Sequence, residues 1–337
     1  MITSMKTPEK LTPTSPPSEL FRKISETLDI AVLLPCHNEE VAIGRVIRDF
    51  RETLPTAAIY VFDNNSTDRT REIAEREGAI VREETLQGKG NVVRRMFSDI
   101  DADYYILADG DDTYDASASI EMLQCAIDDH LDMVNGARQT EETEAYRPGH
   151  RFGNRMLTKI VAMIFGNRIE DMLSGFRVFS RRFVKSFPAL SSGFEIETEL
   201  TIHALELKMP IAEVKTIYRG RPEGSESKLH TYRDGMRILL MILLLVKEER
   251  PLQLFSSIFA ILATLSIVLA WPIVTEFMAT GLVPRFPTAI LSTGLMLLAF
   301  LSIASGLVLD TVTHGRREMK RMWYLSIPER RNVSDAR

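Results

Sequence analysis

The sequence predicts an α/β domain, built on a mostly parallel sheet with helices on both faces, followed by two C-terminal transmembrane helices. Short β-branched runs alternate with helical stretches from residue 30 to residue 136, which is typical of a parallel sheet with crossover helices. Two later segments, 251–275 and 286–309, contain no charged residue, and each is long enough to cross a hydrocarbon core of about 30 Å. A buried helix of a soluble protein is the alternative for each segment.

The alternation gives the order of the elements in the domain. The expected strands are 30–34, 58–62, 79–82, 104–108 and 133–136, and the expected helices are 40–53, 68–77, 90–100 and 117–130. Ligands of such sheets bind outside the carboxyl ends of the strands. The polar loops 35–39, 63–67 and 109–115 all follow strands, so we expect them to form one site.

The chain divides by composition into a soluble part and a membrane part. Residues 1–27 are rich in Pro, Ser, Thr and Lys, lack the apolar core of a signal peptide and are expected to be a disordered leader. Residues 28–231 form the predicted soluble domain. The remaining segments are a juxtamembrane or interfacial helix at 232–250, the two spans, a short non-cytoplasmic connector at 276–285 and a basic cytoplasmic tail at 310–337.

Basic residues predict the orientation of the two spans. Lys247 and Arg250 precede the first span, and Arg285 stands alone in the connector. The basic residues that follow the second span are Arg316, Arg317, Lys320 and Arg321. By the positive-inside rule both flanks and the soluble domain are expected in the cytoplasm, in a multi-pass protein of the inner or plasma membrane. The apolar run 238–246 is too short to span, and it either lies in the membrane interface or packs against the soluble domain.

Charge and cysteine content argue against several functions. The formal net charge of −5 gives no support for nucleic-acid binding, because no segment is basic enough to follow a phosphate backbone. Cys36 and Cys125 lack CxxC spacing, which argues against a disulfide framework or a thiolate zinc site and favours a reducing compartment.

An acidic cluster, Asp109-Gly110-Asp111, follows a strand that is expected to be buried. In an extended backbone residues two apart share a face, so Asp109 and Asp111 can bind one cation, and Gly110 lets a ligand approach closely. A divalent cation held by few carboxylates keeps coordination positions for phosphate, which indicates nucleotide binding. An acidic turn that caps the next helix is the alternative. A calcium EF-hand loop is excluded, because Tyr114 and Ile120 stand where it needs Gly and Glu.

The loops after the first three strands carry further candidates for nucleotide binding. The first loop has no GxGxxG, so a Rossmann dehydrogenase is disfavoured. Asp63 can accept hydrogen bonds from a base or ribose, while residues 66–68 can cap the next helix. The segment Gln87-Gly88-Lys89-Gly90 offers backbone donors and a cation at a helix start, which suits phosphate and is equally compatible with a simple helix-entry turn.

Three later segments carry cations. Basic residues with a period of four can meet lipid headgroups or an acceptor phosphate, or form a solvated face; they are Arg147, Arg151, Arg155 and Lys159. Arg177, in Ser174-Gly175-Phe176-Arg177, offers a fork of donors that fits a phosphate, with a structural ion pair as the alternative. Residues 218–228 mix glycines, cations and hydroxyls, which is typical of a lid over a pyrophosphate or of an ordinary surface loop.

Together these motifs resemble the family 2 glycosyltransferases, and within it the polyprenyl-phosphate sugar transferases of the dolichol-phosphate mannosyltransferase type. The resemblance covers about residues 28–250. It rests on the Pro-x-x-Asn-Glu loop at 35–39, Asp63 with Ser66-Thr67-Asp68, Lys89, Asp109-Gly110-Asp111 and the segment 174–177. It implies a GT-A-type, Rossmann-like fold and a nucleoside-diphosphate sugar as the donor.

The resemblance also implies roles for the matched residues. Asp109 and Asp111 hold Mg²⁺ or Mn²⁺, which neutralises the leaving nucleoside diphosphate. The residues implied in donor binding are Pro35, Asn38, Glu39, Asp63, Lys89, Asp109, Gly110, Arg221, Ser227 and Lys228. The residues implied in catalysis are Asp111, Arg177 and Glu197.

Two details of this assignment depend on the family pattern. Glu197 belongs to an alternating acidic run, 195–199, that by itself indicates a strand edge or a helix start, and the family places an acidic residue here close to the acceptor. Thr113 stands where family members often have Gln, and Ala116 where they have Pro. A third metal ligand is therefore not assigned.

The expected function is an inverting, metal-dependent transfer of a single hexose from a donor of the GDP-mannose or UDP-glucose type to polyprenyl or dolichyl phosphate. A processive polysaccharide synthase is one alternative, although Trp271 and Trp323 do not form the Gln-x-x-Arg-Trp pattern that such enzymes use for the acceptor chain. A non-catalytic membrane scaffold that binds nucleotide sugar is the other. The sequence leaves the donor, the polyprenol and a homo-oligomer open.

Overall fold

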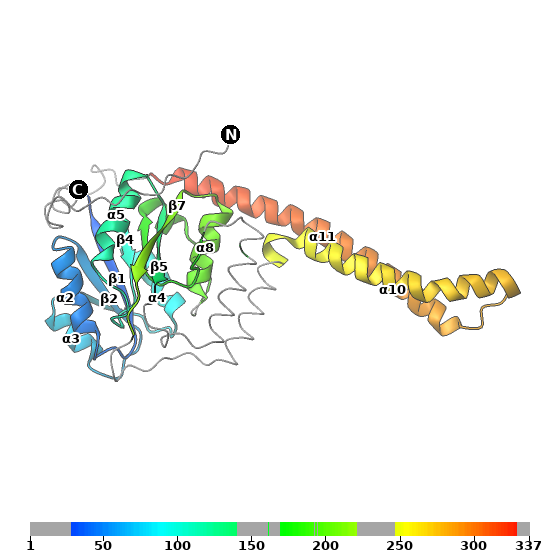
Figure 1. The fold of residues 1–337 in the computed structure, drawn as a ribbon, viewed down its shortest axis with the longest axis horizontal. Coiled ribbons are helices and arrows are strands. Elements are labelled where there is room, and N and C mark those ends of the chain that lie inside the picture. Colours follow the sequence, from blue (N-terminus) through cyan, green and yellow to red (C-terminus); the bar gives the residue numbers. More distant parts are fainter. Residues whose placement is uncertain are drawn as a thin grey trace. The chain divides into compact units, whose positions relative to one another are not determined.

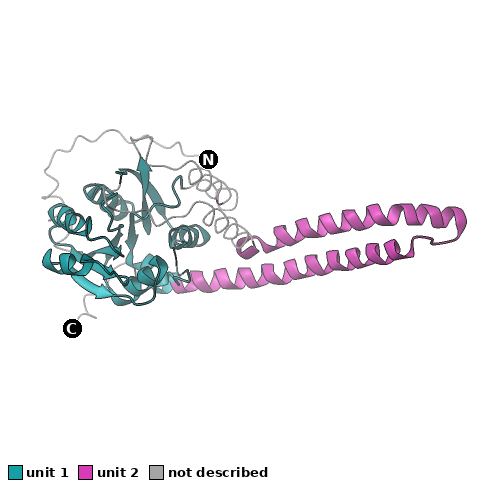
Figure 2. Cartoon of the chain, turned by 90° about the horizontal axis from the view of Figure 1, so that it is seen from below, with its two compact units in different colours: residues 1–147, 168–228, 324–337 teal, residues 148–167, 229–323 magenta. Residues whose placement is uncertain are grey.

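The computed structural model describes residues 28–139, 161, 169–191, 193, 195–220 and 247–328. The chain divides into two compact units, one of residues 1–147, 168–228 and 324–337 and one of residues 148–167 and 229–323 (Figure 2). Several predicted features lie outside the described residues: the leader 1–27, the basic residues between 147 and 159, Arg221, Ser227, Lys228 and the run 238–246.

A seven-stranded mixed sheet forms the centre of the first unit (Figure 1). Its strands are β1 (Ile30–Cys36), β2 (Ala58–Asp63), β3 (Ile80–Glu83), β4 (Tyr104–Leu107), β5 (Met133–Gln139), β6 (Arg177–Ser180) and β7 (Ile211–Ile217). Their spatial order is β3-β2-β1-β4-β6-β5-β7. Strand β6 is antiparallel to both neighbours, and the other pairings are parallel.

Helices cover both faces of this sheet. They are α2 (Ile43–Thr53), α3 (Thr70–Arg76), α4 (Lys89–Asp99), α5 (Ala118–Asp128), α7 (Arg181–Ser186) and α8 (Ile196–Glu206). Successive strand residues point to opposite faces, so the strands contribute to two cores. In one core Val32 and Ile106 of the strands join Ile47 of α2. In the other, the ring of Phe97 on α4 meets that of Phe179 on β6 at a centroid distance of 5.8 Å.

The predicted α/β alternation is confirmed from β1 to β5, with element ends that differ by a few residues. The acidic run at 195–199 begins helix α8 and is not a strand edge. The alternation does not predict β6 or β7, because β6 carries a charged residue at its start and β7 is only half buried. The structure thus confirms a mostly parallel sheet and adds one antiparallel strand inside it.

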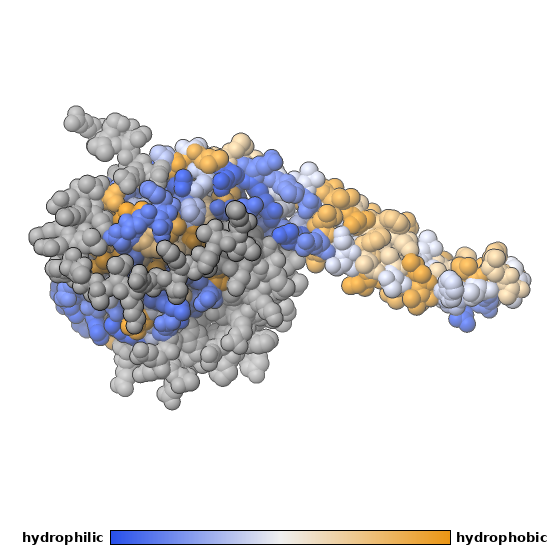
Figure 3. Space-filling view, turned by 45° about the horizontal axis from the view of Figure 1, so that its top comes forward, coloured by the Kyte–Doolittle hydropathy of each residue, from blue (hydrophilic) through white to orange (hydrophobic). Residues whose placement is uncertain are grey.

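The second unit contains α10 (Pro251–Thr280) and most of α11 (Phe286–Ser326), which run antiparallel beside each other (Figures 1 and 2). The hydroxyl of Ser266 donates to the carbonyl oxygen of Ser292 at 2.7 Å, and that of Ser302 donates to Phe255 at 3.1 Å. Both helices are long and apolar enough to cross a membrane, and their surface is mostly hydrophobic (Figure 3).

These helices are longer than the predicted spans. Helix α10 continues through half of the predicted connector, and α11 continues through much of the predicted tail. At the base of the pair Glu249 accepts hydrogen bonds from Arg317 at 2.6 Å and from Arg316 at 3.3 Å. This buried carboxylate therefore ties the segment before α10 to the basic end of α11.

Candidate active site

The first two polar loops are joined by hydrogen bonds at the carboxyl edge of the sheet. Asn38 has a φ of 54°, a left-handed conformation that asparagine tolerates better than most residues. Its backbone N–H donates to Ser66 Oγ at 2.9 Å, and its side-chain oxygen accepts from the Thr67 backbone N–H at 2.8 Å. The Glu39 N–H donates to Thr70 Oγ1 at 2.8 Å. The polar residues of these loops thus hold each other in place and build one wall of the site.

Asp63, at the end of β2, has a buried carboxylate that is only partly satisfied. Its Oδ2 accepts from the Ser66 backbone N–H at 3.2 Å. Its Oδ1 is buried and has no hydrogen-bond partner among the residues that the structure describes. Leaving such an acceptor unpaired costs about 1 to 3 kcal/mol, which a ligand N–H or O–H could recover.

Asn64 connects the second loop to the third. Its side-chain amide donates to the carbonyl oxygens of Glu84 and Leu86 at 2.7 and 2.8 Å, and its Oδ1 accepts from the Gly88 N–H at 2.7 Å. Gly88 has a φ of 126°, which favours glycine, and Lys89 then begins α4. The sequence carries a weak signal for this role, namely an amide side chain directly after Asp63.

Lys89 lies between two carboxylates. Its ammonium group binds Asp109 Oδ1 and lies 2.6 Å from Glu197 Oε1, and the side chains of Lys89 and Glu197 are both buried. Burial by itself lowers the pKa of Lys89, but the two carboxylates outweigh this, so its pKa lies above the ordinary value. The lysine predicted to meet a phosphate is therefore a cation held between two predicted site residues.

Glycines bring the loop before β6 against the acidic cluster. A Cβ on Gly175 would lie 2.6 Å from Asp109 Oδ2, and one on Gly110 would lie 2.5 Å from Cys36 Sγ. The Gly175 N–H donates to the hydroxyl of Tyr114 at 2.8 Å. Both close approaches need a residue without a side chain, which explains the glycines of these two motifs.

Negative charge surrounds the end of β1. Burial raises the pKa of the Cys36 thiol, in the last residue of this strand, well above its usual range, and the charges of neighbouring carboxylates raise it further. These belong to Glu39, Asp63, Asp109 and Asp111. Such negative charge favours the binding of a cation, and the ammonium group of Lys89 offsets part of it.

The residues present fit a divalent cation that also takes ligands from a substrate. Asp111 accepts a hydrogen bond from Thr113 Oγ1 at 2.6 Å, so Thr113 supports a candidate ligand. Among the described residues no group of three or more His, Cys, Asp and Glu side chains could hold a metal. Mg²⁺ commonly binds one or two carboxylates and completes its shell with water and phosphate oxygens. Asp109 and Asp111 match that donor set.

The structure corrects the prediction that Arg177 binds a phosphate. Its side chain is fully buried, and its five N–H groups are all directed at protein acceptors. The acceptors are the carbonyl oxygens of Met172, Ser174 and Glu197, Thr201 Oγ1 and Met133 Sδ. Burial lowers the pKa of Arg177 to about 10, so it remains a cation at neutral pH. It joins β6, the preceding loop and α8 instead of contacting substrate.

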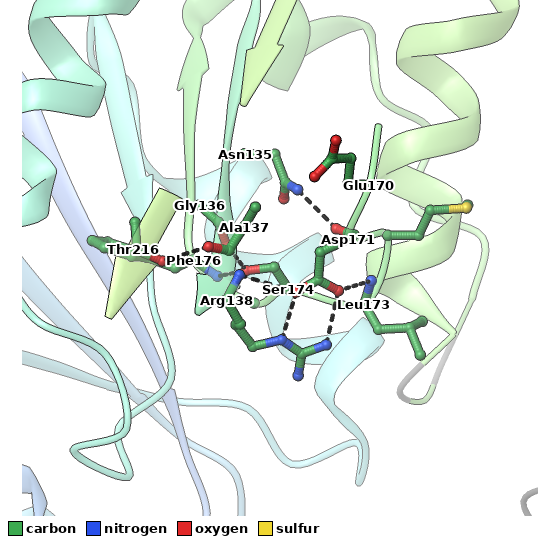
Figure 4. Close-up of polar contacts among 12 residues, drawn as sticks. Asn135, Gly136, Ala137, Arg138, Glu170, Asp171, Leu173, Ser174, Phe176 and Thr216 are labelled. Carbon is green, nitrogen blue, oxygen red and sulfur yellow. Dashed lines mark hydrogen bonds and ion pairs between the residues drawn. The ribbon is translucent and has the colours of Figure 1, made fainter. Parts of the chain in front are cut away.

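Arg138, near the end of β5, is a site residue that the sequence motifs do not identify. It forms a bidentate ion pair with Asp171, with Nε to Oδ2 at 2.7 Å and Nη2 to Oδ1 at 2.9 Å (Figure 4). Its guanidinium carbon lies 5.4 Å from the ring centre of Tyr218. Burial raises the pKa of Tyr218, the charge of Asp111 raises it further, and the charge of Arg138 opposes this rise. An arginine that is held in position by a carboxylate suits an anionic substrate.

Comparison with solved structures shows the fold. The chain superposes on glucosyl-3-phosphoglycerate synthase from Mycobacterium tuberculosis, solved in complex with Mn²⁺ and uridine-diphosphate-glucose, with a TM-score of 0.54. The two share 21% sequence identity, and the match covers 69% of this chain and 84% of that chain. The predicted GT-A-type fold is confirmed.

Comparison of sequences shows the family. Residues 31–187 match the model of Glycosyl transferase family 2. Glycosyltransferase AglJ of Haloferax volcanii is 35% identical over 303 residues, which cover 87% of this chain and 97% of AglJ. The dolichyl-phosphate hexose transferase of the same organism is 32% identical over 66% of this chain and 96% of that protein. The chain therefore belongs to glycosyltransferase family 2. It is a glycosyltransferase, and the resemblance seen in its motifs is confirmed.

Proposed function

We propose that this protein transfers one hexose from a nucleoside-diphosphate sugar to a polyprenyl or dolichyl phosphate, with inversion at the sugar carbon. The observation that carries the proposal is the position of Asp109, which contacts Lys89 and lies against Gly175 beside Asp111, in a chain that also has two long apolar helices. Similarity to the dolichyl-phosphate hexose transferase supports a lipid phosphate as the acceptor.

The donor is assigned to the edge formed by the loops after β1, β2 and β3. Asp63 Oδ1 is placed to accept a hydrogen bond from the base or ribose, since it is buried without a partner among the described residues. Asp109 and Asp111 would hold Mg²⁺ or Mn²⁺, which supplies Lewis-acid stabilisation of the leaving diphosphate. Both GDP-mannose and UDP-glucose types of donor fit this assignment.

The acceptor is assigned to the region of Arg138, whose guanidinium carbon lies 5.4 Å from the ring centre of Tyr218. A lipid phosphate is already an anion at neutral pH, so it needs positioning and charge screening more than a strong base. The ion pair between Glu197 and Lys89 agrees with this, because Glu197 Oε1 lies 2.6 Å from the ammonium group and is already engaged by it. Arg138 is oriented by Asp171 and would bind the phosphate.

The membrane orientation is part of the proposal. Basic residues flank the two apolar helices at the ends expected in the cytoplasm, and the connector carries Arg285 alone. Transfer would then take place at the cytoplasmic face of the inner or plasma membrane.

A product assay tests the function. The full chain in detergent is incubated with UDP-glucose or GDP-mannose, undecaprenyl or dolichyl phosphate and Mg²⁺ or Mn²⁺, and the lipid product is detected by mass spectrometry. Asp111→Ala is expected to abolish transfer, whereas the matched control Asp112→Asn is expected to retain it, because Asp112 pairs with the exposed Arg45 at 3.2 Å. A polymeric product would instead indicate a processive synthase. Donor binding without any lipid product would indicate a scaffold.

A further inference from the structure

The contact between Lys89 and Asp109 places a fixed cation where a metal ion is expected. Lys89 binds Asp109 Oδ1, and only 9% of its side chain is exposed. The same ammonium group lies 2.6 Å from Glu197. A carboxylate oxygen proposed as a metal ligand is therefore already engaged by a cation of the protein, which it shares with Glu197.

Hydrogen bonds fix the backbone next to Lys89 and at Glu197. Lys89 begins α4 directly after Gly88, whose N–H is fixed by Asn64 at 2.7 Å. Glu197 lies in the first turn of α8, where its carbonyl oxygen accepts from Arg177 at 3.0 Å. Backbone segments on both sides are thus anchored, so the ammonium group stays close to the two carboxylates.

This arrangement weakens the site for a metal ion that arrives alone. A divalent ion that approaches Asp109 meets a buried positive charge at short range, where repulsion is poorly screened. The remaining protein ligands are few, because Asp111 shares its oxygen with Thr113 and no larger cluster exists among the described residues. The negative charge of a nucleoside diphosphate would offset the charges of both Lys89 and the metal ion. Its phosphate oxygens would also be ligands of the metal ion.

We propose that Lys89 is the resident counter-ion of Asp109 and makes binding of the divalent cation depend on the nucleoside diphosphate. This inference rests on the proposed function, since it takes Asp109 as a metal ligand. Coupling between two ligands is reciprocal, so the metal strengthens diphosphate binding by the same factor. The enzyme would then hold neither ligand firmly without the other.

Binding of Mn²⁺ to the full chain in detergent tests the inference without any sugar transfer. Free Mn²⁺ is measured by electron paramagnetic resonance, with and without UDP or GDP. The wild type is expected to bind Mn²⁺ about tenfold or more tightly when the diphosphate is present. Lys89→Met is expected to bind Mn²⁺ alone about tenfold more tightly than the wild type and to lose most of the coupling. General damage to the fold would not raise metal affinity.

Two control variants sharpen the result. Arg48→Met removes a cation from an ion pair with Glu77 elsewhere in the same unit, and it should leave Mn²⁺ binding unchanged. Lys89→Arg keeps the charge and should keep the coupling.

The possible failures are distinguishable. Equal Mn²⁺ affinity of the wild type with and without diphosphate overturns the inference, whether or not Lys89→Met folds. Equal Mn²⁺ affinity of Lys89→Met and wild type, with coupling intact, overturns the role of Lys89 but leaves the metal site. Transfer that continues in EDTA, without Mn²⁺ binding under any condition, overturns the metal-dependent function and the inference with it.

Discussion

The two regions that we assign to the donor and to the acceptor, called here the donor side and the acceptor side, are stabilised in different ways. The donor side consists of β1, β2, β3 and the loops that follow them, and mostly neutral groups such as Asn38, Ser66 and Asn64 bind neighbouring backbone there. The acceptor side consists of β5, β6 and α8, where ionised side chains are buried with their partners. Arg177 and the Arg138–Asp171 pair are the main examples.

This difference has an energetic consequence. A hydrogen bond between neutral groups contributes about 1 kcal/mol to the free energy of unfolding. When a substitution removes one of the two groups near the surface, water can partly replace it as the hydrogen-bond partner of the other. Removing one member of a buried ion pair such as Arg138–Asp171 leaves the other charge without its partner, which costs about 3 to 5 kcal/mol. Removing Arg177 leaves several buried acceptors unpaired, at about 1 to 3 kcal/mol each. The donor side should therefore tolerate substitution better than the acceptor side.

The largest expected effect is that of Arg177→Lys. The acceptors surround the planar guanidinium group of Arg177 on several sides. Lysine has three donors on a single nitrogen and cannot reach all of these acceptors. We expect a loss of about 3 kcal/mol in the free energy of unfolding, measured as a lower Tm of the full chain in detergent by differential scanning calorimetry. A Tm equal to that of the wild type would show that the buried hydrogen bonds of Arg177 do not stabilise the acceptor side.

Asn64→Ala should have a smaller effect, on the donor side. It removes two donors and one acceptor that connect the second and third loops, with an expected cost of about 2 kcal/mol. Because Gly88 and Lys89 follow this contact, KM for the donor sugar should rise more than kcat falls. Asn64→Asp keeps the acceptor for the Gly88 N–H and should retain part of the affinity. A fall in kcat alone would argue that Asn64 does not shape the donor loops.

The smallest effect is expected for Asp68→Asn. Burial raises the pKa of Asp68, but hydrogen bonds from Thr70 and from the Glu40 backbone outweigh it, so the pKa lies below its ordinary value. A lowered pKa in the folded state stabilises the protein above the ordinary aspartate pKa, and this stability is lost as the pH falls through the folded-state pKa. At neutral pH the variant should be less stable by under about 1 kcal/mol. Calorimetry over a pH series should show the difference shrinking in acid, and a difference that grows in acid would contradict this sign.

The donor side was predictable from sequence because its signals are local. A β-branched run gives the strand, and polar residues directly after it, such as Asp63 and Asp109, lie at the edge where ligands of parallel sheets bind. The same reasoning gave the wrong role for Arg177. A cation two residues after a glycine suggested a phosphate site, and only the packing of α8 on β6 shows that the donors of Arg177 are taken.

By itself the sequence determined the order of strands and helices from β1 to β5, the polar loops at the carboxyl ends of these strands, the acidic cluster and the two apolar helices. These features follow from short-range patterns of polarity, which any local segment expresses. The tertiary structure decided the antiparallel position of β6, the buried role of Arg177, the placement of Arg138 and the contact of Lys89 with Asp109 and Glu197. The last three depend on which partners a buried charged group finds among residues far apart in the chain, because a buried charge must find a partner wherever the fold provides one.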